Sequence, residues 1–205
     1  MSLPDRLRPA LIWGALVSAI LAPILAAAYS PLLQWREPIY IAAGFAGIFG
    51  MAIMLMQPLL AVGALPGLSL QTSRSLHRYG GMVLVLAVAG HVLGLWITSP
   101  PDVIDVLLFR SPTPFAIWGA LAMWAIFGAA LLASLRLRLP LRVWRWGHTA
   151  FVTLAVIGTI VHALQITGTM EQVTKILLSV LVVGALFAAI MRRKVWAMGV
   201  RSRRG

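Results

Sequence analysis

Six apolar stretches dominate the sequence, and each is long enough to cross a lipid bilayer as a helix. A hydrocarbon core of about 30 Å and a helical rise of about 1.5 Å per residue require roughly 20 such residues. Pro, Gly and Ser residues, which favour turns, separate the stretches. The pattern predicts an all-α membrane protein with one transmembrane domain over residues 1–205. The predicted helices cover about 10–29, 39–62, 80–98, 114–135, 147–166 and 174–191.

Composition excludes several classes of protein. With 60% hydrophobic and 11% charged residues, the chain lacks the polar surface of a soluble domain of 205 residues. The net charge of +12 would suggest nucleic acid in a soluble protein, but here the basic residues lie in short loops between apolar runs. The absence of cysteine excludes disulfides, iron–sulfur clusters and thiolate zinc sites. The sequence contains no GxGxxG or P-loop pattern, and the helices leave no space for a nucleotide- or flavin-binding domain.

The distribution of Lys and Arg predicts the orientation in the membrane. Only Arg36, Arg110 and Lys175 fall on one side, and fourteen basic residues fall on the other. Short cytoplasmic loops are enriched in basic residues, so both termini are expected in the cytoplasm. We expect the lipid partner to be a bacterial inner membrane. The cytoplasmic set is Arg6, Arg8, Arg74, Arg78, Arg136, Arg138, Arg142, Arg145, Arg192, Arg193, Lys194, Arg201, Arg203 and Arg204.

All four histidines belong to two of the predicted helices and share one spacing. His77 and His91 belong to the third helix, His148 and His162 to the fifth, and each interval is fourteen residues. Fourteen residues return a helix to within about 40° of its starting direction and advance it about 21 Å. The third and fifth helices run parallel, so His77 and His148 share one depth, called here the inner pair. His91 and His162 share the other depth and form the outer pair.

Two imidazoles per layer limit which metal centre fits. Zinc takes about four ligands, and no Asp, Glu or Cys lies at either depth to complete the set. A heme iron, whose macrocycle fills the equatorial positions, needs only two axial ligands. A membrane histidine can instead form an interhelical hydrogen bond or one step of a proton relay. Glycines near the histidines would admit a flat ring, or would serve helix packing instead. They are Gly80, Gly81, Gly90, Gly94, Gly147 and Gly158.

The residues flanking the histidines resemble those of the ferric reductase-like transmembrane domain. This group includes ferric reductases, NADPH oxidase membrane domains and the heme subunit of a bacterial methionine sulfoxide reductase. The resemblance implies six helices with two stacked b-type hemes between the third and fifth, carrying electrons outward. His77 and His148 would bind the inner heme, and His91 and His162 the outer heme. The matching segments are LHRYG (residues 76–80) with His91, and WRWGH (residues 144–148) with His162.

The function expected from this pattern is transmembrane electron transfer, as the electron-transfer component of an oxidoreductase. The donor would be a separate flavoprotein reductase or quinol, and the acceptor a periplasmic protein or membrane complex. The alternative is a heme-bearing accessory subunit without catalytic function. Heme propionates need cationic partners, and Arg74, Arg78 and Arg145, with Arg142, lie near the inner ligands in sequence. Gly81 is a further candidate for contact with the inner heme. The loop 99–115 is expected to lie flat at the outer interface.

Overall fold

Seven α-helices and one short 3-10 helix make up the computed structural model over residues 7–193, the part of the chain it describes. Six of the seven helices are long and apolar enough to cross a membrane, and the described residues contain no strand. The prediction of an all-α protein with six spans is therefore confirmed. Arg6 and the basic tail from Lys194 onward lie outside the described residues. The helices are α1 (Leu7–Ala28), α2 (Pro38–Ala61), α3 (Leu70–Thr98), α4 (Pro100–Leu107), α5 (Pro114–Ser134), α6 (Leu141–Gln165) and α7 (Gln172–Arg193).

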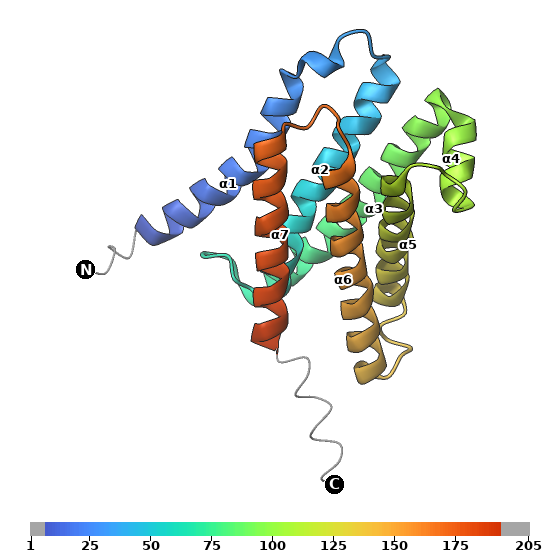
Figure 1. Cartoon of the computed structure of the whole chain (residues 1–205). Coiled ribbons are helices and arrows are strands. Elements are labelled where there is room, and N and C mark those ends of the chain that lie inside the picture. Colours follow the sequence, from blue (N-terminus) through green and yellow to red (C-terminus); the bar gives the residue numbers. More distant parts are fainter. Residues whose placement is uncertain (1–6, 194–205) are drawn as a thin grey trace.

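Two antiparallel hairpins form the centre of the bundle. Helix α2 packs along α3, and α5 packs along α6, in the two most extensive helix contacts of the molecule. Helix α7 packs against α2, α1 and α6 and so ties the hairpins together. The indole Nε1 of Trp13 in α1 donates to the carbonyl oxygen of Pro66, at 3.1 Å, and fastens α1 to the α2–α3 loop. Helices α3 and α6 run in the same direction (Figure 1), as the parallel arrangement of the histidine helices requires.

The two histidine helices begin earlier than hydropathy predicts. Helix α3 starts at Leu70 instead of residue 80, and α6 starts at Leu141 instead of residue 147. Hydropathy identifies the apolar part of a helix and misses a polar first turn. In α3 that turn is capped by Ser69, whose side chain accepts from the backbone nitrogen of Thr72 at 3.1 Å. The extensions place His77 and His148 inside regular helix, two turns from each start.

Large apolar side chains cover the outside of this bundle, whereas a soluble helical bundle buries them. Large apolar side chains such as Leu86 and Leu93 of α3 remain 69% and 62% exposed. Of the apolar window of α3, only 6% of residues are buried within the protein, compared with 39% in α2 and in α5. A soluble protein does not leave apolar surface of this extent in water. The protein is therefore a multi-pass membrane protein whose exposed apolar faces lie in lipid.

The segment after α3 contains a helix that sequence reasoning described only as an interfacial segment. Helix α4 begins at two prolines, with Asp102 in its first turn, where an acidic group is favoured by the helix dipole. It contacts the end of α3 and the start of α5, at the end of the bundle where α3 finishes (Figure 1). With eight residues it is too short to cross a bilayer.

Candidate functional site

The inner histidines lie opposite each other on α3 and α6. The ring centroids of His77 and His148 are 6.5 Å apart, and the ring planes cross at 76°. The two helices are otherwise not a closely packed pair, since each makes its main contacts within its own hairpin. The predicted meeting of His77 and His148 at one depth is therefore present in the structure.

The outer histidines lie farther along the same two helices. His91 and His162 each follow an inner histidine by fourteen residues, about 21 Å along α3 and α6. Both are partly buried, and the ring of Phe115 lies edge-on to His162 with centroids 5.8 Å apart. The fourteen-residue spacing thus produces two layers along α3 and α6.

Each of the four imidazoles makes the same kind of hydrogen bond to the neighbouring helix of its hairpin. The Nδ1 atoms of His77 and His91 lie 3.1 and 2.7 Å from carbonyl oxygens of α2, those of Gln57 and Ala43. On the other hairpin, the Nδ1 atoms of His148 and His162 lie 3.1 and 2.8 Å from carbonyl oxygens of α5. These belong to Ala129 and Phe115.

This bond has a chemical consequence for the opposite ring nitrogen. A carbonyl oxygen only accepts, so an Nδ1 bonded to it must carry the proton, and Nε2 then keeps its lone pair. Histidine ligands in metalloproteins use this arrangement, in which the second nitrogen fixes the tautomer and the orientation of the ring. The arrangement therefore suits imidazoles that donate Nε2 to a metal.

Side chains surround the inner pair. The indole of Trp144 stacks on His148, with ring centroids 5.7 Å apart and planes at 15°, and the guanidinium carbon of Arg136 lies 5.2 Å from the Trp144 ring centre. The amide of Gln57, oriented with its nitrogen toward α3, bonds the His77 carbonyl oxygen at 3.1 Å and the backbone nitrogen of Gly81 at 3.2 Å. That nitrogen also reaches Nδ1 of His77 at 2.8 Å, where it competes with the backbone contact.

Glycines on the neighbouring helices accommodate the outer pair. A Cβ on Gly47 of α2 would lie 3.0 Å from Nδ1 of His91, and one on Gly119 of α5 would lie 2.7 Å from Nδ1 of His162. Sequence reasoning missed both glycines, because they lie on helices that carry no histidine. Gln57 was missed as well, although an amide in the otherwise apolar span 38–61 is a visible signal.

Most glycines expected beside a flat ring serve helix packing instead. A Cβ on Gly94 would lie 2.7 Å from that of Ala43, and a Cβ on Gly158 would lie 2.9 Å from the Trp118 carbonyl oxygen. A Cβ on Gly147 would meet the side chain of Leu132, and the Gln57 side chain occupies the space beside Gly80. A Cβ on Gly81 would have ordinary contact distance to Gln57, while a Cβ on Gly90 would meet nothing within 4 Å outside the nearby backbone of its own helix. Gly80, Gly94, Gly147 and Gly158 therefore let α3 and α6 approach the other helix of each hairpin.

The candidate arginines lie on α3 and α6, close in sequence to the inner histidines. Arg74 and Arg78 are exposed, and Arg78 donates to Ser75 Oγ at 3.5 Å. Arg145 is half-buried next to Trp144. No three His, Asp or Glu side chains gather into a metal-binding cluster within residues 7–193. The donor set therefore consists of two imidazoles per layer.

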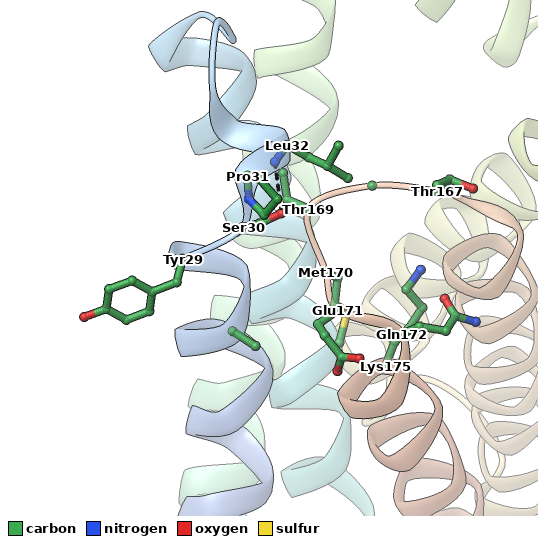
Figure 2. A pocket seen from close by; sticks show the side chains of 12 residues that line it. Tyr29, Ser30, Pro31, Leu32, Thr167, Thr169, Met170, Glu171, Gln172 and Lys175 are labelled. Atoms are coloured by element: carbon green, nitrogen blue, oxygen red, sulfur yellow. Dashed lines mark hydrogen bonds between the residues drawn. The ribbon is translucent and has the colours of Figure 1, made fainter.

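A cavity of about 390 Å³ lies elsewhere, between the end of α1 and the loop before α7 (Figure 2). Buried Lys175 lines it and donates to the carbonyl oxygen of Ile166 at 2.7 Å, at the C-terminal end of α6. Glu171 caps α7, and bonds from the backbone nitrogens of Thr174 and then Val173, both at 2.7 Å, lower its carboxyl pKa. None of the four histidines lines this cavity, so it is separate from the two layers.

Comparison with known proteins agrees with the geometry. The family model described as "Ferric reductase like transmembrane component" matches residues 43–159, which span α2 to α6 and include three of the four histidines. Neither the curated proteins nor the solved structures include a match to the chain. Because the family match covers more than half of the sequence, the chain belongs to the ferric reductase-like transmembrane family.

Proposed function

We propose that the protein transfers electrons across a membrane by means of two b-type hemes, each held by two histidines. The inner heme would be bound by His77 and His148, and the outer heme by His91 and His162. The observation that carries the proposal is the inner pair, whose rings lie opposite each other at 6.5 Å. Membership of the ferric reductase-like family supports a membrane electron-transfer role.

The inner pair fits an iron with two axial ligands. With metal–nitrogen bonds of about 2 Å, two imidazoles on opposite sides of one metal have ring centroids roughly 6 Å apart. The observed 6.5 Å agrees with this separation. Because Nδ1 of each inner histidine contacts a backbone carbonyl of the neighbouring helix, the opposite nitrogen Nε2 would remain available to the iron. The ring separation and the backbone contacts at Nδ1 together support a pair of metal ligands.

Heme bound in this way would supply one-electron redox chemistry. With two histidines holding each iron, small-molecule binding at the metal would be disfavoured. The four imidazoles hold their orientation through the backbone of α2 and α5, which limits reorganisation at the ligands. The layers lie about 21 Å apart along each helix, which divides the passage across the bilayer into short distances.

The direction of transfer follows from the predicted topology. The inner layer lies at the basic, cytoplasmic end, and the outer layer near the opposite face. The donor would be a separate cytoplasmic flavoprotein reductase or quinol, and the acceptor a periplasmic protein or membrane complex in a bacterial inner membrane. Arg74, Arg78 and Arg145 would supply positive charge near the inner propionates, and Gly81 would contact the same heme.

Two measurements test the proposal. Reduced-minus-oxidised spectra of the purified protein should show low-spin b-type heme, with two equivalents per chain by pyridine hemochrome. Protein in liposomes with an internal reductant should then reduce a membrane-impermeant acceptor outside, whereas protein-free liposomes should not. A chain without heme contradicts the proposal. Redox-inert hemes, or hemes that are reduced without passing electrons outward, favour the accessory subunit instead.

A further inference from the structure

Two buried polar hydrogens at the start of α3 and α6 have no acceptor. Within residues 7–193, Ser73 Oγ and Trp144 Nε1 are the buried side-chain nitrogen and oxygen atoms that lack a hydrogen-bond partner. Ser73 is completely buried. Leaving such a group unpaired costs about 1–3 kcal/mol, so a chain that keeps two of them has an acceptor to offer them in its working state.

The two residues occupy equivalent positions relative to the inner pair. Ser73 precedes His77 by four residues, and Trp144 precedes His148 by four residues. Residues four apart share one helix face, about 6 Å apart along the axis. Helices α3 and α6 run in the same direction (Figure 1). Both residues therefore lie one turn before the inner pair in sequence, on the side where the two helices begin. Trp144 also stacks directly on the ring of His148.

The surroundings favour an anionic acceptor. Ser73 and Trp144 are each the fourth residue of their helix, where the helix dipole presents its positive end. Arg74 and Arg145 follow them directly in sequence, and the guanidinium of Arg136 lies over the Trp144 ring at 5.2 Å. No acidic residue occurs between residues 38 and 101, or between 106 and 170. The chain itself therefore provides no carboxylate in α3 or α6 for these donors.

We propose that Trp144 Nε1 and Ser73 Oγ donate hydrogen bonds to the propionate carboxylates of the inner heme. The inference rests on the proposed function, because it requires a heme between His77 and His148. It also assigns an orientation to that heme, with its carboxylates toward the helix starts. The arginines then contribute charge around the carboxylates, and the two neutral donors fix their position.

Exchange of natural heme for its dimethyl ester tests this inference, because the ester lacks the carboxylate charge. Wild-type protein, Trp144→Phe and Ser73→Ala are each loaded with heme or with heme dimethyl ester. Release to a heme-scavenging globin is then followed by absorbance. Trp144→Phe retains an aromatic ring that can stack on His148 and removes only the N–H group. The matched controls are Trp146→Phe, whose ring is 43% exposed in the same helix, and Ser134→Ala, an exposed serine.

Loss of a hydrogen bond to a charged group should speed release of natural heme from one of the two sites by about tenfold to a hundredfold. Release of the dimethyl ester should change much less, and both controls should behave as wild type. Equal rates for wild type and both variants overturn the inference, and so does equal acceleration of heme and ester, which indicates a packing defect. If Trp144→Phe retains no inner heme, the same comparison in Ser73→Ala decides. A wild-type chain that binds no heme contradicts the proposed function itself, so the two failures are distinct.

Discussion

The inner and outer histidine pairs use the same hydrogen bond but different surroundings. At the outer pair, the Nδ1 contacts are short, 2.7 and 2.8 Å, and glycines of α2 and α5 admit the imidazoles against the backbone. At the inner pair, both contacts are 3.1 Å, and the side chains of Trp144 and Gln57 contact the imidazoles or their backbone. The outer layer is therefore held by close backbone approach, and the inner layer by polar and aromatic side chains.

The largest effect is expected from removal of a histidine, which should empty one layer and spare the other. His91→Ala or His162→Ala should each lower heme content from two equivalents to about one, because a single axial imidazole cannot hold the group in place. The double variant should lose no more than either single one, since both residues serve one site. Pyridine hemochrome assay measures the content. Loss of both hemes in either single variant would show that the layers are not independent.

A methyl group at Gly119 should disturb the outer layer most among the glycine substitutions. In Gly119→Ala the added Cβ would lie 2.7 Å from Nδ1 and 2.8 Å from Cε1 of His162, so the imidazole has to move and its bond to the Phe115 carbonyl weakens. We expect release of the outer heme to be about tenfold faster, the equivalent of one hydrogen bond. Gly44→Ala is the control, because a Cβ there has no neighbour within 4 Å. Wild-type release from Gly119→Ala would mean that the glycine has no part in placing His162.

Gly47→Ala should produce the same change in weaker form. Its Cβ would approach Nδ1 of His91 to 3.0 Å and Cε1 to 3.2 Å, which a shift of a few tenths of an ångström relieves. We expect a change of about twofold to threefold in release of the outer heme, and none for the inner heme. If Gly47→Ala speeds release of the outer heme more than Gly119→Ala does, the expected order of the two substitutions is wrong. That result would show that α2 yields less to the added methyl group than α5.

Much of this arrangement follows from the sequence, and the rest depends on contacts between helices. The apolar stretches predict six spans, and the equal spacing of the histidines predicts the meeting of His77 with His148. For Gly94 and Gly158 the sequence left two readings open, space for a flat ring or helix packing, and the contacts across each hairpin favour packing. Gly47 and Gly119 act across a helix contact, and only the pairing of α2 with α3 and of α5 with α6 reveals them. The stacking of Trp144 on His148 depends on rotamers, which spacing does not determine.

Gln57→Leu should affect the inner layer alone. The variant removes the bonds of the amide to the His77 carbonyl oxygen and to the Gly81 nitrogen, and it frees Nδ1 of His77 for the backbone oxygen of residue 57. Interhelical polar contacts in membranes contribute about 0.6 kcal/mol on average, so we expect the free energy of unfolding to fall by about that amount. The spectrum of the outer heme should stay unchanged. A shift in both hemes would contradict the separation of the layers, and differential scanning calorimetry with low-temperature spectra measures both effects.

The smallest effect is expected at Glu171, beyond the outer pair, and it should depend on pH. The backbone nitrogens of Thr174 and Val173 lower the carboxyl pKa in the folded state, so the ionised group stabilises the start of α7. This contribution is present above the ordinary glutamate pKa of about 4.3 and is lost as pH falls through the lower, folded value. Glu171→Gln should therefore have a slightly lower Tm than wild type at pH 7, and the two Tm values should converge at strongly acidic pH.

Unchanged heme spectra in Glu171→Gln would show that the outer layer is fixed within its own hairpins, because the altered cap lies outside them. A parallel loss of the outer heme would instead mean that the α6–α7 connection helps to hold His162. The outer pair would then depend on this loop as well as on the backbone of α2 and α5.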